Sequence, residues 1–141
     1  MIDERNGERK MTTPGRECVV DASTVLAAIK REPGYQRAIA AIQTAIISSV
    51  NFAEVASHLA KSGVSLDEIK SVLSSFALPT IDFNMEQALE AARLHPLTVR
   101  QGLSLGDRAC LALAVLRGLP VMTADRKWAS VDIGIEIVLV R

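Results

Sequence analysis

Short apolar stretches alternate with longer amphipathic segments along most of the chain. Five of the short stretches are typical of strands and lie at residues 17–20, 45–48, 79–82, 119–122 and 135–140. Strands that alternate with helices favour a parallel sheet that is covered by helices on both faces. The pattern therefore predicts an α/β fold, a three-layer α/β/α sandwich around a short, mostly parallel central sheet.

Segments with helical periodicity separate the predicted strands. We expect a helix at residues 23–30, and a second helix that follows a break at Pro33-Gly34 and runs to about residue 44. Further helices are expected at residues 51–61, 66–76, 84–94 and 105–117, with a helical turn at 125–129. Met85, Leu89 and Ala92 share one face of the fifth helix. The stretch Ala109–Leu116 is apolar all round, which indicates a helix buried on several sides.

Length and composition set limits on the domain organisation and on the partners. The first 15 of the 141 residues have no apolar pattern, so we expect a flexible N-terminal extension (1–15) and a single domain (16–141). Lys plus Arg and Asp plus Glu are 16 each, so a polyanion would need locally concentrated basic residues. No apolar run approaches the roughly 20 residues of a membrane span. The N-terminus also has no apolar signal core, which favours the cytoplasm and no membrane partner.

Four acids occupy comparable places relative to the predicted strands. Asp21 directly follows the first strand, and Glu54 lies in the first turn of the helix after the second strand. Asp107 begins the helix that is apolar all round, and Asp125 follows the fourth strand. In an open α/β sheet, ligands bind outside the carboxyl ends of the strands, so all four acids are candidates for one site.

Two interpretations of these acids stay open at this point. Each acid alone is explained by helix capping, because a carboxylate in a first helical turn gains roughly 0.3–1 kcal/mol from the helix dipole. As a group they would repel one another, since two charges about 4 Å apart cost roughly 4 kcal/mol at an effective dielectric near 20. A converged set of oxygen ligands would suit Mg²⁺ or Mn²⁺.

Hydroxyl groups flank two of the four acids. Ser23 lies two residues after Asp21, and Thr123 lies two residues before Asp125. Either hydroxyl could donate to a carboxylate and fix its direction, as residues in the second shell of a metal site do. An ordinary role as a helix cap explains both hydroxyls equally well.

Several basic and aromatic residues lie close to the acids in sequence. Arg108, Arg126 and Lys127 are candidates for contacts with phosphate groups, although a solvated helix face explains them as well. Trp128 is either a platform for a stacked base or a core residue. The histidines at positions 58 and 95 have no evident link to the acids, and we expect them at the surface or partly buried.

Four segments of this sequence resemble the PIN-domain family, and VapC-type toxins of bacterial toxin–antitoxin pairs above all. The segments are "VVDASTVLAAI", "SSVNFAEVASHL", "LSLGDRACLALA" and "VMTADRKW", and the resemblance covers about residues 17–141. It implies a Mg²⁺- or Mn²⁺-dependent endoribonuclease. Asp21, Glu54 and Asp107 match the three most regular acids of the family, and Asp125 matches a more variable fourth. The resemblance also implies a homodimer and a small cognate antitoxin protein, whereas the N-terminal extension departs from the family pattern.

Two other functions are compatible with an acid after the first strand. A haloacid-dehalogenase-like phosphatase would use a second Asp two residues later as its general acid, but that position holds Ser23. A receiver-like Mg²⁺-binding signalling module would need paired acids near the first strand and a Lys after a later one. The acids of this chain are instead spread over four elements, which favours the nuclease.

Overall fold

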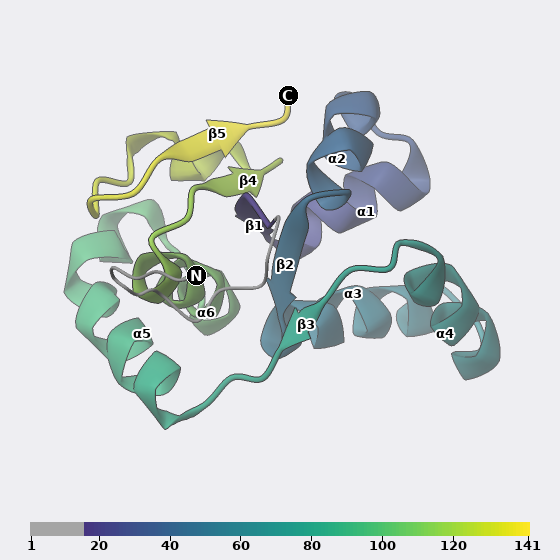
Figure 1. The fold of residues 1–141 in the computed structure, drawn as a ribbon, viewed down its shortest axis with the longest axis horizontal. Coiled ribbons are helices and arrows are strands. Elements are labelled where there is room, and N and C mark those ends of the chain that lie inside the picture. Colours follow the sequence, from purple (N-terminus) through teal and green to yellow (C-terminus); the bar gives the residue numbers. More distant parts are fainter. Residues whose placement is uncertain (1–15) are drawn as a thin grey trace.

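The computed structural model describes residues 16–141 and has a five-stranded sheet at its centre. The strands lie in the order β3-β2-β1-β4-β5, and all four neighbouring pairs are parallel (Figure 1). Their bounds are Cys18–Val20 (β1), Ala45–Ser48 (β2), Thr80–Ile81 (β3), Val121–Thr123 (β4) and Ile137–Leu139 (β5). The predicted parallel α/β architecture is confirmed, and the expected N-terminal extension lies outside the described residues.

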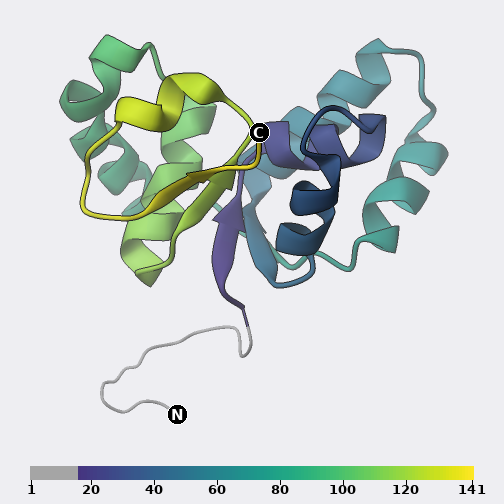
Figure 2. The same ribbon diagram turned by 90° about the horizontal axis from the view of Figure 1, so that it is seen from above.

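Six α-helices and two 3₁₀ helices connect and cover the described strands. The α-helices are Ala22–Lys30 (α1), Tyr35–Ile42 (α2), Ser49–Lys61 (α3), Leu66–Ser75 (α4), Met85–Thr98 (α5) and Leu105–Arg117 (α6). The 3₁₀ helices are Val99–Gln101 (η1) and Arg126–Ser130 (η2). Viewed from above, α1 to α4 lie on one side of the sheet, and α5, α6 and η2 lie on the other (Figure 2). No helix in the described part of the chain is long and apolar enough to cross a membrane.

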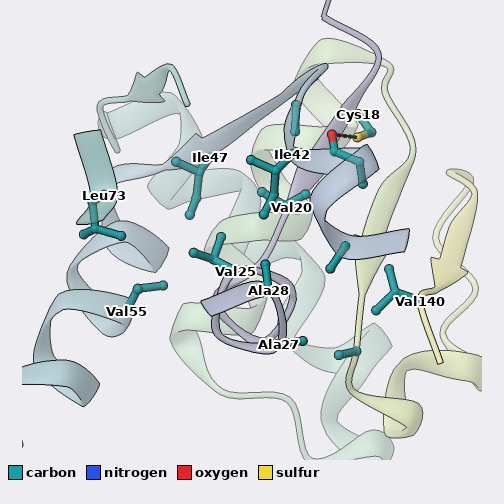
Figure 3. Packing of buried hydrophobic residues seen from close by; sticks show 14 of the residues in the cluster. Cys18, Val20, Val25, Ala27, Ala28, Ile42, Ile47, Val55, Leu73 and Val140 are labelled. Carbon is teal, nitrogen blue, oxygen red and sulfur yellow. Dashed lines mark hydrogen bonds between the residues drawn. The ribbon is translucent and has the colours of Figure 1, made fainter. Parts of the chain in front are cut away.

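The two faces of the sheet support two separate hydrophobic clusters, because successive strand residues point to opposite faces. Val20 and Ile47 pack with α1 to α4, and Cys18 joins them, its thiol lying 3.7 Å from the carbonyl oxygen of Ala41 (Figure 3). Val19 and Ile46 face the other way, toward α5, α6 and η2. Strands that are buried on both faces explain why the sequence shows continuous apolar stretches rather than alternation.

Helix α6 confirms the prediction of a helix buried on several sides, because every residue from Ala109 to Ala114 is buried. The apolar face of α5 that Met85, Leu89 and Ala92 share is not the buried face of this helix. Met85 and Leu89 are exposed, at 78% and 67%, while Ala91 and Leu94 pack in the second cluster. A buried polar residue hid this face in the sequence: Gln87 is 5% exposed, and its side-chain amide donates to the carbonyl oxygen of Asp82.

Candidate functional site

All four predicted acids line one open pocket at the carboxyl ends of the strands. Asp21 directly follows β1 and Asp125 follows β4, while Glu54 comes from α3 and Asp107 from the first turn of α6. The pocket has a volume of about 290 Å³ and is lined by Asp21, Ala22, Ser23, Leu26, Glu54, His58, Asp107 and Asp125. The fold therefore brings together carboxylates that are up to 104 residues apart in the sequence.

Asp21 is the buried carboxylate of the pocket, with a relative exposure of 4%. It caps α1 by accepting a hydrogen bond from the backbone N–H of Thr24 at its Oδ1 (3.0 Å). The hydroxyl of Ser23 lies within 2.9 Å of both carboxylate oxygens, and Thr123 donates to Oδ2 at 2.6 Å. Burial raises the pKa of Asp21 above its usual value, even though these hydrogen bonds act in the opposite direction.

The two hydroxyls named from the sequence also join the end of β1 to the end of β4. Thr123 Oγ1 accepts from the backbone N–H of Asp125 (3.0 Å), and Ser23 Oγ accepts from the N–H of Ala124 (2.9 Å). Thr24 is a third hydroxyl, buried within 3.0 Å of Asp21 Oδ1, which the sequence analysis missed. Its position three residues after a capping Asp was the available signal.

Glu54 is exposed and is held at the pocket by Asn51. The Asn51 side-chain amide donates to Glu54 Oε1 (2.8 Å) and to the carbonyl oxygen of Gly106 on α6 (3.0 Å). A Cβ atom added at Gly106 would overlap the Glu54 carboxylate, so a glycine is needed for this approach. Helix capping, which the sequence offered as an explanation for each acid, does not hold for Glu54, because α3 begins at Ser49 and is capped by Ser48.

Asp107 and Asp125 both cap helices at the pocket. Asp107 forms a capping box with Ser104: its Oδ2 accepts from the Ser104 N–H (2.9 Å), and its own N–H donates to Ser104 Oγ (3.1 Å). Asp125 caps η2 by accepting from the N–H of Lys127 at its Oδ1 (3.1 Å). Capping and convergence on one site are therefore not alternatives, because Asp21, Asp107 and Asp125 do both.

Lys127 places a positive charge between two of the acids. Its Nζ lies 3.9 Å from Asp107 Oδ2 and 3.7 Å from Asp125 Oδ2, and its side chain is 46% exposed. Contacts of this length in solvent are weak. The ammonium group nevertheless reduces the repulsion between the two carboxylates. From the sequence alone, a metal ion was the only group expected to relieve this repulsion.

The donor set of the pocket fits Mg²⁺ or Mn²⁺, because its acidic side chains offer only oxygen atoms. Within residues 16–141, however, no three His, Cys, Asp or Glu side chains are arranged as a ready-made metal site. Lys127 lies against Asp107 and Asp125, and Glu54 is turned toward Asn51. The residues therefore fit a divalent ion chemically, and the exposed carboxylates must turn to coordinate it.

The other residues named from the sequence lie in different surroundings. Arg108 donates from Nη1 to the carbonyl oxygen of Ala91 on α5 (2.9 Å) and does not line the pocket. Arg126 donates from Nη1 to the carbonyl oxygen of Arg141 (3.0 Å). Trp128 is fully buried in the second hydrophobic cluster, so it cannot stack on a base, and its role is in the core.

His58 was wrongly separated from the acids in the sequence analysis. It lines the same pocket as the carboxylates, whereas His95 does not. The signal was present in the sequence, because His58 follows Glu54 by four residues, and residues four apart share one face of a helix.

Comparisons with known proteins agree with the fold. The family model described as "PIN domain" matches residues 18–134. No curated protein sequence matches the chain significantly.

Solved structures of toxin–antitoxin complexes have the same fold. VapBC2 from Rickettsia felis, bound to a promoter DNA fragment, has a chain with a TM-score of 0.69 and 19% identity, covering 86% of this chain and 96% of that one. A toxin–antitoxin complex from Klebsiella pneumoniae has a chain with a TM-score of 0.70 and 18% identity, and the match covers 89% of this chain and 98% of that one. DNA-bound VapBC from Salmonella typhimurium has a chain with a TM-score of 0.68 and 22% identity, and the match covers 89% of this chain and 99% of that one.

Proposed function

The chain belongs to the PIN-domain family, and we propose that it is a Mg²⁺- or Mn²⁺-dependent endoribonuclease that acts as the toxin of a toxin–antitoxin pair. One observation carries the proposal. Asp21, Glu54, Asp107 and Asp125 come from four separate elements and line a single pocket at the carboxyl edge of the sheet. Their shared position, which capping alone does not require, supports a common function.

The four carboxylates have two roles in the proposed mechanism. Asp21, Glu54 and Asp107 would hold the divalent ion, and Asp125 would either hold it as well or orient the attacking water. Ser23 and Thr123 fix the direction of Asp21 through their hydrogen bonds. When bound, the ion lowers the pKa of water and stabilises the charge that develops on the phosphate.

The surroundings of Asp21 favour the nuclease over a phosphatase of the haloacid-dehalogenase type. That chemistry would place a carboxylic acid at position 23, where this chain has a serine whose hydroxyl lies 2.8 Å from Asp21 Oδ2. A hydroxyl with an ordinary pKa cannot serve as the general acid at neutral pH. The Ser23 side chain instead supports the orientation of Asp21.

The first experiment is cleavage of total RNA by the purified protein with Mg²⁺, Mn²⁺ or EDTA, followed by mapping of the new RNA ends. We expect new ends at defined positions with either metal and none with EDTA. Single-stranded DNA and a phosphate monoester are tested in parallel. Phosphate release from the monoester without RNA cleavage would reject the nuclease in favour of the phosphatase.

We also propose a homodimer that binds a small antitoxin protein. Exposed large apolar residues support partner surfaces, since small monomers rarely leave such side chains bare. Phe52, Leu66 and Val72 lie on α3 and α4, within the segment 23–76. More of them lie outside it, on α5, η1 and α6: Met85, Leu89, Leu97, Val99, Leu105 and Leu116.

The partner proposal is tested by light scattering at micromolar concentration. The protein is measured alone and together with the product of a small reading frame just upstream of its own gene. We expect a dimer alone and a larger complex with the upstream protein. A clean monomer in both samples would reject these partners without affecting the nuclease proposal.

A further inference from the structure

A second basic group lies at the pocket, and it comes from a different part of the fold than Lys127. His58 lines the pocket, and its Nε2 lies 3.2 Å from Nζ of Lys30, in the last turn of α1. Neither residue was among the phosphate contacts expected from the sequence. Helix α1 packs against α3, which brings together side chains that are 28 residues apart.

The topology of the sheet puts the two basic groups on different sides of the pocket. His58 is on α3, which follows β2, whereas Lys127 is on η2, which follows β4. Strands β2 and β4 flank β1 on opposite sides, and Asp21 stands at the end of β1 between them. A nucleic-acid strand that runs from one basic group to the other therefore crosses the carboxylates.

The contact between Lys30 and His58 defines the role of each side chain. An ammonium group has only donors, so His58 must accept at Nε2 and carry its own proton on Nδ1. The neutral imidazole holds the ammonium beside the pocket without cancelling its charge. His58 is thus a positioning residue, and Lys30 supplies the positive charge.

The charge of Lys30 is only partly balanced within the described chain. Glu32 Oε2 lies 3.5 Å away, but the same carboxylate also pairs with Arg141 at 3.1 Å. Two cations therefore share one acid. The Lys30 side chain is 44% exposed and can reach a ligand from solvent.

We propose that Lys30, positioned by His58, binds a backbone phosphate of single-stranded RNA next to the pocket, on the side away from Lys127. The proposal rests on the RNA-cleaving function proposed above. Four carboxylates repel a polyanion, so the strand needs positive charges at the edges of the pocket to cross it. Lys30 and Lys127 provide these charges on the two sides.

The test measures RNA binding and catalysis in matched variants. Fluorescence anisotropy with a single-stranded RNA is recorded in EDTA over a range of salt concentrations for wild type, Lys30→Gln and Lys70→Gln. Lys70 is the control, because it is an exposed lysine on α4 in a different, apolar groove. We expect Lys30→Gln to weaken binding about 3- to 10-fold and to lower the salt slope by about 0.7, while Lys70→Gln matches wild type.

The role of His58 is tested by replacing its imidazole acceptor with another acceptor or with none. His58→Gln keeps an acceptor within reach of Lys30 and should retain RNA affinity, whereas His58→Ala should lose it to the extent that Lys30→Gln does. In Mn²⁺-supported cleavage, Lys30→Gln should raise KM and leave kcat unchanged, because a phosphate away from the reacting bond contributes uniform binding. Lys30→Arg should restore KM.

The outcomes separate this proposal from the proposed function. If wild type cleaves RNA and Lys30→Gln binds it as well as Lys70→Gln does, the phosphate contact is rejected and the nuclease stands. If wild type neither binds nor cleaves RNA, both are rejected. Equal melting temperatures of the variants show that any loss of affinity is not due to unfolding.

Discussion

The floor and the rim of the pocket carry the same kind of acid in opposite settings. The floor consists of Asp21, Ser23, Thr24 and Thr123. The rim consists of Glu54, Asp107, Asp125 and Lys127. On the floor, a buried carboxylate accepts hydrogen bonds at both of its oxygens. On the rim, the carboxylates are half-buried or exposed, and a lysine lies beside two of them.

This difference suits the proposed uptake of a divalent ion by a pocket that is already ordered. The floor is held by hydrogen bonds between β1, α1 and β4, so its geometry does not depend on a metal. The rim is balanced by weak, solvent-exposed contacts that an incoming ion can replace. We therefore expect rim substitutions to change activity at little cost in stability, and floor substitutions to change both.

The largest expected effect is loss of cleavage when one of the proposed metal ligands on the rim is neutralised. Glu54→Gln and Asp107→Asn should each lower RNA cleavage by more than about 100-fold, a larger loss than is typical when a residue behind a metal ligand is changed. An asparagine at position 107 can still accept from the Ser104 N–H, so the helix cap and the melting temperature should be retained. Glu86→Gln, an exposed acid on α5, is the control. Cleavage by Asp107→Asn at the normal rate would falsify the site assignment.

A second rim variant separates activity from stability by steric means. Gly106→Ala would overlap the Glu54 carboxylate, which sits at the end of a flexible side chain and can move aside. Alanine favours a helix over glycine by up to about 1 kcal/mol, so the melting temperature should hold or rise. Cleavage should nevertheless fall by about 10- to 100-fold, because Glu54 is displaced. Equal rates of RNA cleavage by Gly106→Ala and wild type would show that the position of Glu54 is not important.

On the floor, Thr123→Val tests the hydrogen bond that orients Asp21. Valine keeps the shape but removes the donor to Asp21 and the acceptor for the Asp125 N–H. We expect cleavage to fall about 10- to 100-fold and stability to fall by about 1–3 kcal/mol, since a buried partner is left unsatisfied. Thr123→Ser should restore both quantities. Normal cleavage by the valine variant would show that Asp21 needs no such support.

The architecture and the four acids of the pocket could be predicted because their signals lie in the local sequence. The strands were recognisable as short apolar stretches, and Asp21 with Ser23 follows the first of them directly. The capping box of Ser104 and Asp107 is a pattern of four consecutive residues. Such features are set by nearby backbone groups, so the sequence alone carries them.

The rest of the site depends on packing between distant segments, which one sequence does not display. The contact of Lys30 with His58 requires α1 to lie against α3. Arg108 is directed to α5 by a carbonyl group 17 residues away, and the sequence placed it beside the acids only because it follows Asp107. The direction of a side chain at a helix end is decided by its tertiary neighbours, and that limited the prediction of the RNA contacts.

A smaller effect is the stabilisation of the folded protein by a divalent ion. At about 100 times the dissociation constant, Mn²⁺ bound only to the folded state should add roughly 2.7 kcal/mol to the free energy of unfolding. For a domain of this size that corresponds to a rise in melting temperature of about 5–10 °C. The Asp21→Asn/Asp107→Asn double variant should show no rise, and monovalent salt at equal ionic strength should have no such effect on either protein. An equal response of both proteins to Mn²⁺ would mean that the ion binds elsewhere.

The smallest expected effect concerns Asp21 in the absence of metal, where floor and rim differ most in burial. The pKa of Asp21 in the folded protein is raised above its ordinary value of 3.8. The folded state therefore binds this proton more tightly than the unfolded chain. The resulting stability is fully present below pH 3.8 and is lost as the pH rises through the folded pKa. At neutral pH the burial of this carboxyl group thus destabilises the metal-free protein relative to pH 3.8.

Asp21→Asn should remove this penalty, because an asparagine oxygen can still accept from the Thr24 N–H. In EDTA at pH 7 we expect the variant to be more stable than wild type by about 1 kcal/mol, or about 2–4 °C in melting temperature. The difference should shrink as the pH falls toward 3.8, since the free-energy penalty of burying this group disappears once it is protonated in both the folded and the unfolded state. Urea unfolding of both proteins between about pH 7 and pH 4 measures it. A variant that is less stable than wild type throughout this range would show that the floor hydrogen bonds, and not burial of the charge, dominate the energy of Asp21.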